Sequence, residues 1–187
     1  AQPADPEELN KALNGEGGTL VFTNSSNAYH WPMTVEQKDG RTVVFASNCD
    51  SSYSQAVVQT QADVKAGDVL VLEYKLENDV SYNAMLVTLD DEVVKKITLT
   101  KDWVTYAYRF DEGGSHKVSV TYDVVVTDDD YDSNLWIDSI RVVSGEEADK
   151  ALAANPQYPV AEKTEIQLLN ENVQKAYYYP EEDPNAK

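Results

Sequence analysis

The middle of the chain alternates apolar and polar residues with a period of two. In the run after Gly67 every second residue is apolar, namely Leu70, Leu72, Tyr74 and Leu76, with Glu73 and Lys75 between them. This alternation predicts a β-strand with one buried face. Similar short runs recur at intervals of about ten residues and are separated by turn residues, a rhythm typical of antiparallel sandwiches.

Three further runs extend the predicted core. The residues expected to point inward are Met85, Val87 and Leu89, then Val104, Tyr106, Tyr108 and Phe110, then Val118, Val120, Tyr122 and Val124. Each strand thus contributes one apolar face, as two packed sheets require. The predicted fold class is all-β, an antiparallel jelly-roll β-sandwich with short helical segments at its N- and C-terminal ends.

The N-terminal helix is predicted from its capping residues. Asp5 is a suitable N-cap, Pro6 fits the first helical position, and Gly15 is a suitable stop. Leu9 and Leu13, four residues apart, give this helix one apolar stripe.

The sandwich is expected to end near Val143, since Gly145 breaks the pattern and residues 146–154 form an alanine-rich helical stretch. Beyond it, residues 164–169 and 174–179 resemble two more strands, and a Pro-rich acidic linker follows. The predicted organisation is a helix and lead-in over 1–18, a jelly-roll sandwich over 19–145 and a tail over 146–187. The tail either covers the sandwich or begins another module.

Composition excludes several classes of partner. The chain has 33 acidic and 15 basic residues and a formal net charge of −18, so its field repels phosphate backbones and anionic headgroups. We expect no nucleic acid partner. No run of about 18 apolar residues predicts membrane insertion, and no signal peptide opens the chain. With one cysteine and two histidines, neither an intramolecular disulfide nor a structural zinc site is expected.

A family resemblance spans about residues 9–143. It is carried by short elements in a fixed order: Leu13-Asn14 before Gly17-Gly18-Thr19-Leu20 and Phe22, Tyr29-His30-Trp31, Ser47-Asn48, Ala66-Gly67-Asp68, Trp103, Gly114-Ser115-His116 with Tyr122, and Leu135-Trp136-Ile137-Asp138-Ser139-Ile140. In this order they resemble a jelly-roll module related to MAM and cleaved-adhesin domains. Such modules are found in exported surface proteins of anaerobic, gut-type bacteria.

The resemblance implies a secreted or cell-surface location, neighbouring domains in a larger surface protein, and a role in adhesion, glycan binding or spacing. It implies no catalysis. The chain departs from the pattern at Asn83, where an aspartate is expected, and at Cys49, where a small residue is usual. The first departure weakens any inherited metal site.

Catalytic signals from the residues themselves are weak. So many carboxylates place acidic pairs at glycosidase spacing by chance, and no Gly-x-Ser-x-Gly elbow is present. His116, beside a Gly-Gly turn, is expected to be structural. We therefore predict that the chain is not an enzyme.

Calcium is the one cofactor that the sequence suggests. Asp128, Asp130 and Asp132 alternate in a loop between two predicted strands, and Asn134 follows. Calcium takes six to eight hard oxygen ligands, which such a loop can supply. The alternative is a solvated acidic loop.

Glycan binding needs exposed aromatic faces, and the chain has three tryptophans and twelve tyrosines. Trp31 and Trp136 are expected to be packed. Trp103 falls on the face opposite Val104. The candidate ligand-binding residues are therefore Trp103 and the loop tyrosines Tyr53, Tyr82 and Tyr131.

Two functions remain open. The first is a carbohydrate-binding module for a polysaccharide or glycan, such as starch, in an exported bacterial protein. The second is a structural or adhesive spacer, or a protein-binding module, without a sugar site.

Overall fold

The structure is a computed structural model. It describes residues 4–15, 17–25, 32–47, 54–78, 83–98, 100, 102–124 and 133–155. The chain divides into two compact units, Ala1–Ala151 and Leu152–Lys187. Nearly all described residues belong to the first unit, so the predicted division at residues 18 and 145 stays a prediction.

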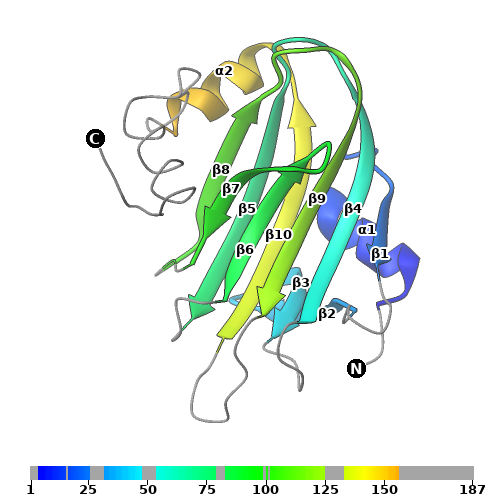
Figure 1. The fold of residues 1–187 in the computed structure, drawn as a ribbon, viewed down its shortest axis with the longest axis vertical. Coiled ribbons are helices and arrows are strands. Elements are labelled where there is room, and N and C mark those ends of the chain that lie inside the picture. Colours follow the sequence, from blue (N-terminus) through cyan, green and yellow to red (C-terminus); the bar gives the residue numbers. More distant parts are fainter. Residues whose placement is uncertain are drawn as a thin grey trace. The chain divides into compact units, whose positions relative to one another are not determined.

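The first unit is built on two antiparallel five-stranded sheets (Figure 1). The first sheet has the order β1 (Phe22–Ser25), β4 (Ser54–Val64), β9 (Gly114–Val124), β6 (Ala84–Leu89) and β7 (Glu92–Ile97). The second sheet has the order β2 (Thr34–Lys38), β3 (Arg41–Ser47), β10 (Ser133–Val143), β5 (Val69–Asn78) and β8 (Val104–Arg109). The predicted jelly-roll sandwich is confirmed.

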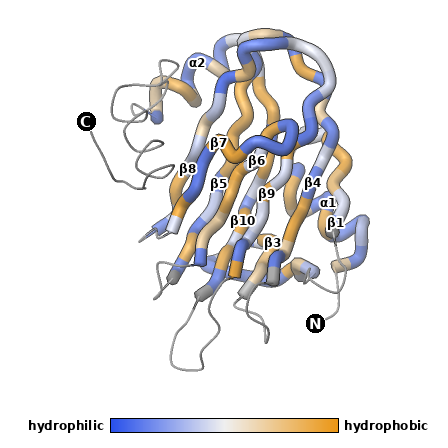
Figure 2. Tube along the Cα trace, viewed as in Figure 1, coloured by the Kyte–Doolittle hydropathy of each residue, from blue (hydrophilic) through white to orange (hydrophobic). Residues whose placement is uncertain are grey.

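The predicted inward faces form the core between the sheets, and apolar residues run along both sheets (Figure 2). Leu70, Leu72 and Leu76 are at most 1% exposed, and burial raises the pKa of Tyr74 to about 12. One predicted core residue is wrong. Val104 pairs with Tyr74 but is 36% exposed, because it is the first residue of β8, an edge strand of its sheet.

Helix α1 (Pro6–Asn14) forms as predicted. The Asp5 carboxylate accepts a hydrogen bond from the Glu7 N–H at 2.9 Å, which satisfies one of the free donors at the helix start. Leu9 and Leu13 are buried in the core. The helix thus covers part of the sandwich with the predicted stripe.

Two asparagines join α1 to the segment that enters β1. The Asn14 side chain donates to the Leu20 carbonyl at 2.7 Å and accepts from the Leu20 N–H at 3.0 Å. Asn10 makes the same pair of bonds with the backbone of Phe22. Each side-chain amide therefore makes the two backbone hydrogen bonds that a neighbouring strand would otherwise make. A Cβ on Gly18 would lie 2.6 Å from the Asn14 carbonyl oxygen, so this approach requires glycine.

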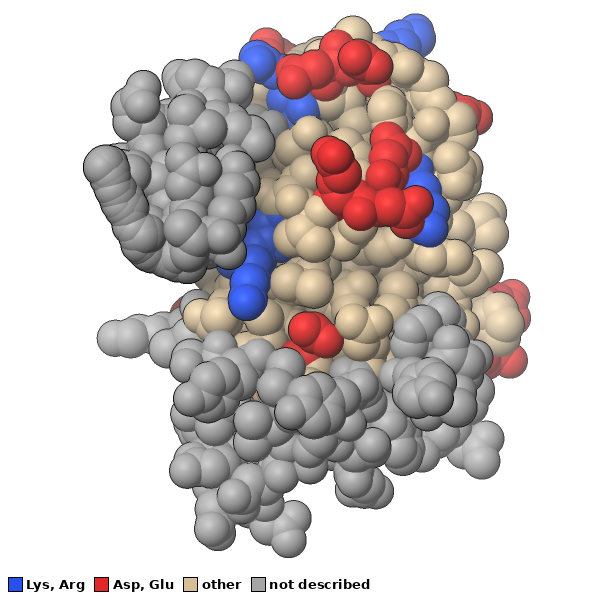
Figure 3. All heavy atoms as spheres, viewed as in Figure 1, with Lys and Arg blue, Asp and Glu red and all other residues tan. Residues whose placement is uncertain are grey.

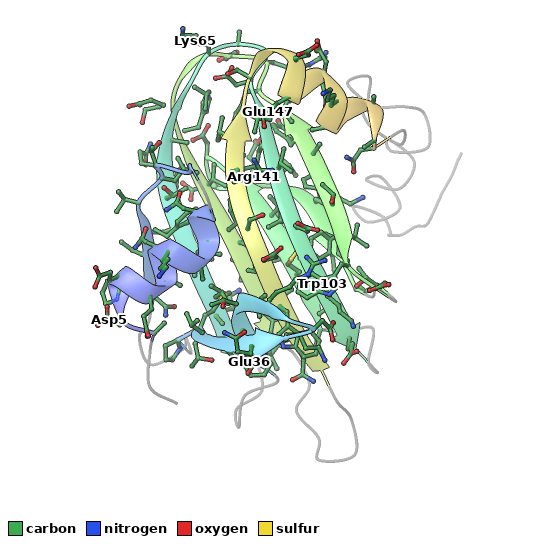
Figure 4. The ribbon with its side chains drawn as sticks, turned by 180° about the vertical axis from the view of Figure 1, so that it is seen from behind. Asp5, Glu36, Lys65, Trp103, Arg141 and Glu147 are labelled. Atoms are coloured by element: carbon green, nitrogen blue, oxygen red, sulfur yellow. The ribbon has the colours of Figure 1, made fainter. Side chains whose placement is uncertain are left out.

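The β2–β3 hairpin, residues 34–47, pairs with β10 through residues 44–47, and its tip extends across the outer face of the second sheet (Figure 4). Its turn is Asp39-Gly40, both with positive φ, as a tight hairpin turn requires. Asp39 reaches Lys75 on β5 and Trp103 beside β8. Because β10 and β5 separate β3 from β8, the tip of the hairpin must cross both strands.

Strand β10 ends at Val143, and helix α2 (Gly145–Ala153) follows within one residue of its predicted bounds. The two strands predicted over 164–169 and 174–179 lie outside the described residues and stay predictions.

Candidate functional site

The outer face of the first sheet offers no aromatic platform in the described part of the chain. Among phenylalanine, tyrosine and tryptophan, its described strands carry only Phe22 and Tyr122, and both are buried in the core. Figure 3 shows this face, with a few acidic groups and wide uncharged areas. Among the described residues, the aromatic side chains on an outer face therefore belong to the second sheet.

The outer face of the second sheet carries Phe45, Trp103 and Trp136. Trp136 is packed, as predicted, with 5% exposure, although it lies beneath the hairpin and not between the sheets. Its Nε1 donates to the Glu36 carboxylate at 2.8 Å, the Lys38 ammonium lies 4.2 Å from its ring centroid, and Phe45 packs beside it. Trp136 thus anchors the hairpin.

Trp103 lies on this outer face, as the alternation indicates, and is half-buried. Its Nε1 donates to Asp39 Oδ2 at 3.0 Å, and the Lys75 ammonium contacts the same oxygen at 3.2 Å. These two hydrogen bonds, the one from Trp103 first, lower the pKa of Asp39. The Arg41 guanidinium lies 4.2 Å from the Trp103 ring centroid, so one face of the indole is already covered.

Arg41 also holds two carboxylates of the sheet. Its Nη1 lies 3.1 Å from Glu73 Oε2 on β5 and 2.9 Å from Asp138 Oδ2 on β10. Partial burial, followed by the charge of Glu73, raises the pKa of Asp138, and Arg41 offsets this only in part. The three groups form a partly desolvated charge cluster.

An open groove of about 670 Å³ lies beside this cluster. Helix α1 forms one wall, the hairpin forms another, and β5 and β10 form the floor. The residues that line it include Glu8 and Lys11 on α1, Val35 and Thr42 on the hairpin, Glu73 on β5, and Asp138, Ser139 and Arg141 on β10. Polar groups from three directions thus face one concave surface, as ligand sites require.

The alternation along β10 contains a signal for this site. Leu135 and Ile137 point inward, but the next buried residue is Ile140, three positions later. The register shifts between Ile137 and Ser139, so a bulge lies at Asp138, and bulges often re-aim side chains near sites. Sequence reasoning missed the groove residues because α1, β2, β5 and β10 meet only in the folded chain.

The remaining predicted site residues lie outside the described part of the chain. These are Tyr53, Tyr82 and Tyr131 for glycan and Asp128, Asp130 and Asp132 for calcium, and they stay predictions. Within the described residues, no group of three or more His, Cys, Asp or Glu side chains is arranged to hold a metal ion.

His116 has a protein partner for each ring nitrogen. Nδ1 lies 2.6 Å from the Asp90 carboxylate, and Nε2 lies 2.8 Å from the Glu112 carbonyl oxygen. The ring also stacks on Phe110. The hydrogen bonds with Asp90 and, to a smaller extent, Glu112 raise the pKa of His116. They also join the β6–β7 turn to the β8–β9 loop.

Comparison with known proteins supports the fold and assigns no family. No family model and no curated protein match the chain. Among solved structures, the secreted serine protease VesC from Vibrio cholerae is 17% identical with a TM-score of 0.53, and the match covers 75% of this chain and 28% of that one. The match therefore spans less than a third of VesC, and at this identity the likeness is one of fold.

Solved structures with more distant similarity include carbohydrate-binding modules. TmCBM61, solved with β-1,4-galactotriose, is 11% identical with a TM-score of 0.46, and the match covers 78% of this chain and 100% of that one. A family 35 module from an environmental isolate is 16% identical with a TM-score of 0.43, covering 71% and 92%. With TM-scores below 0.5, these two likenesses carry no conclusion about ligand.

In the described residues, no helix has the length and apolar character to cross a membrane.

Proposed function

We propose that this chain is a non-catalytic carbohydrate-binding module of an exported bacterial protein, and that its glycan lies in the groove between α1, the hairpin and the β5–β10 floor. The groove itself carries the proposal. Its lining combines hydrogen-bonding side chains with the aliphatic surface of Val35. Sugars offer hydroxyls to the first and C–H faces to the second.

The charge cluster suits this role, because Glu73 and Asp138 are already oriented by Arg41 before any ligand arrives. Oriented carboxylates accept hydrogen bonds from sugar hydroxyls at low ordering cost. Since Arg41 engages both carboxylates, we assign them to binding and not to acid–base catalysis. Trp103, which borders the cluster through Arg41, holds the hairpin wall in place.

Relation to MAM and cleaved-adhesin modules, a cell-surface location in gut-type bacteria and starch as ligand form the finer part of this proposal, and they rest on the sequence resemblance. Calcium binding at Asp128, Asp130 and Asp132 is a separate proposal. Binding to the folded form alone would raise the melting temperature with calcium concentration. A melting curve that millimolar calcium leaves unchanged after chelation would remove it.

The rival function, a structural or adhesive module, has one observation in its favour. Cations from the hairpin cover both described tryptophans, with Arg41 over Trp103 and Lys38 over Trp136. A ring whose face is already occupied offers less surface for stacking. The carbohydrate-binding function therefore depends on sugar binding in the groove and not on an indole. The structural function needs no sugar site.

Affinity gel electrophoresis on a panel of starch, β-galactan, soluble cellulose and polygalacturonate tests the proposal. Ser139→Tyr would fill the groove floor, whereas Gln59→Tyr places the same ring on the outer face of the first sheet. We expect at least one polysaccharide to retard the wild type and Gln59→Tyr but not Ser139→Tyr, with matching thermal melts for the two variants. Retardation by none of the polysaccharides would favour the spacer.

A further inference from the structure

Arg141 lies on the floor of the groove, and none of the described acidic side chains forms an ion pair with it. In the β10–β5 register it pairs with Val71, and the next pair along this face is Ser139 with Glu73. Glu73 is therefore its diagonal neighbour, close enough for a long side chain to reach. Glu73, however, is bound to Arg41 at 3.1 Å, and Arg141 forms no ion pair within the described residues.

The other cations on this outer face are engaged. Lys75 pairs with Asp39, Arg109 with Asp111, and Arg41 with Glu73. Lys38 lies over the Trp136 ring. Arg141 is the exception on the described part of this face, which is notable in a chain with 33 acidic and 15 basic residues.

A second cation faces the same groove from the opposite wall. Lys11, in the last turn of α1, lines the groove and likewise has no ion-pair partner in the described residues. The acidic side chains of the floor, Glu73 and Asp138, share Arg41. Glu8 is the remaining acidic group in the lining. The lining thus holds three acidic and two basic groups, and Arg41 beside it brings the formal charge of this surface to zero.

We infer that this groove binds an anionic sugar unit, one with a carboxylate or a sulfate ester, and that Arg141 pairs with that anion. This inference rests on the proposed glycan-binding function and specifies its ligand class, an anionic glycan in place of neutral starch. The planar guanidinium makes two parallel hydrogen bonds to a carboxylate or sulfate oxygen pair. Lys11 adds a point charge from the α1 wall, while Glu73 and Asp138 accept hydrogen bonds from the sugar hydroxyls.

The net charge of −18 sets the conditions for testing this. Repulsion of a long polyanion acts over a distance that shrinks to about 8 Å at 0.15 M salt. The contact pair at Arg141 is screened less, because it is short-ranged and partly desolvated. Short oligosaccharides at this salt concentration therefore report the groove itself.

Isothermal titration with matched trisaccharides provides the test. The ligands are trigalacturonate, α-1,4-galactotriose, which has a neutral hydroxymethyl group in place of each carboxylate, and a sulfated galactotriose. The variants are Arg141→Gln, Arg141→Lys and Lys65→Gln, where Lys65 is an exposed cation on the β4–β5 turn that does not line the groove. We expect Arg141→Gln to weaken binding of an anionic trisaccharide by about tenfold or more.

Arg141→Lys should restore part of that affinity, while Lys65→Gln should bind like the wild type. Preference for the carboxylated or the sulfated ligand identifies which anion the site takes, and either supports the inference. Equal affinity for galactotriose, or an Arg141→Gln variant that binds the anionic ligand normally, overturns it and leaves the glycan-binding function standing. If no sugar binds in either this assay or the polysaccharide panel, the proposed function fails and the inference falls with it.

Discussion

The guanidinium of Arg41 lies 4.2 Å from the centre of the Trp103 ring, although β10 and β5 lie between β3, which carries Arg41, and β8, which begins just after Trp103. This contact exists because the β2–β3 hairpin crosses the outer face of its sheet. Asp39 and Lys75 secure the tip of the hairpin, and Glu73 and Asp138 secure Arg41. One wall of the groove therefore depends on residues from four segments of the chain.

A double-mutant cycle measures the Arg41–Trp103 contact. We expect Arg41→Gln and Trp103→Leu to show a coupling free energy of about 0.5–1 kcal/mol, as cation–π pairs at exposed sites do. Urea unfolding of the wild type, both single variants and the double variant gives this value. A parallel cycle of Arg41 with the distant Val93 should give none. Coupling indistinguishable from that control would show that the contact adds nothing to stability.

Trp103→Ala should lower stability as well, because it also removes the hydrogen bond to Asp39. A neutral hydrogen bond contributes about 1 kcal/mol, and one to a charged group more. A loss of sugar binding in that variant would therefore mix hairpin disorder with lost contact, which is why the binding test uses Ser139 and Gln59.

The core makes a sharper stability prediction. Leu72 is 0% exposed, and truncation to alanine should cost about 2–5 kcal/mol, through lost burial and the cavity left behind. Val93, 56% exposed on β7, supplies the matched control, and Val93→Ala should change the free energy of unfolding by no more than about 0.5 kcal/mol. Equal effects at the two positions in chemical denaturation would contradict the assignment of faces.

The alternation predicted this core because the strand period and the burial of one face are local properties. Leu70, Leu72 and Leu76 are inward for the same reason that Glu73 and Lys75 are outward. Val104 shows the limit of that reasoning, since alternation assigns a face but not the position of a strand at the edge of a sheet. Trp136 shows another, because its burial comes from a hairpin that folds over the outer face.

The groove could not be predicted from local sequence patterns. Lys11 and Arg141 are 130 positions apart in the sequence. No local sequence pattern indicates that they line one surface. Trp103 was correctly placed on the outer face, but its partners Asp39 and Arg41 come from a turn that sequence alone does not direct toward β8. Long-range topology, not residue type, therefore decides which polar groups meet.

The asparagine pairs that join α1 to β1 should be sensitive to substitution. Asn14→Ala would leave the partly buried backbone of Leu20 without the donor and acceptor it now has. An unsatisfied buried group costs about 1–3 kcal/mol. Asn14→Asp keeps the size and the acceptor but loses the donor, so both variants should melt earlier than the wild type. Wild-type melting of Asn14→Ala in a thermal scan would show that water replaces the bonds at no cost.

His116 gives the fold a pH dependence. Its folded pKa is raised above 6.5, chiefly by Asp90, so its contribution to stability is complete below pH 6.5 and is lost as pH rises through the folded value. The pKa of Asp90 is lowered from 3.8 by the same contact, and its contribution fades as pH falls below that value. Proton NMR titration should place the His116 pKa above 6.5, and Asp90→Asn should return it toward 6.5. An unshifted titration in the wild type would disprove the ion pair.

Asp138 should show the opposite behaviour to an ordinary salt-bridged aspartate. Its folded pKa is raised from 3.8, because partial burial and the charge of Glu73 outweigh the attraction of Arg41. The ionised form is therefore disfavoured in the folded state, and stability is lost as pH rises through the folded pKa.

Asp138→Asn removes this charge and keeps an oxygen that accepts from Arg41. We expect this variant to melt above the wild type at pH 7 and to match it below pH 3.8, while Asp111→Asn, at an exposed carboxylate beside Arg109, should change little. Thermal melts across pH 3–8 test the sign directly: an Asp138→Asn variant that melts below the wild type at pH 7, by a margin that grows with pH, would mean that Arg41 dominates and that the floor of the groove holds Asp138 firmly ionised.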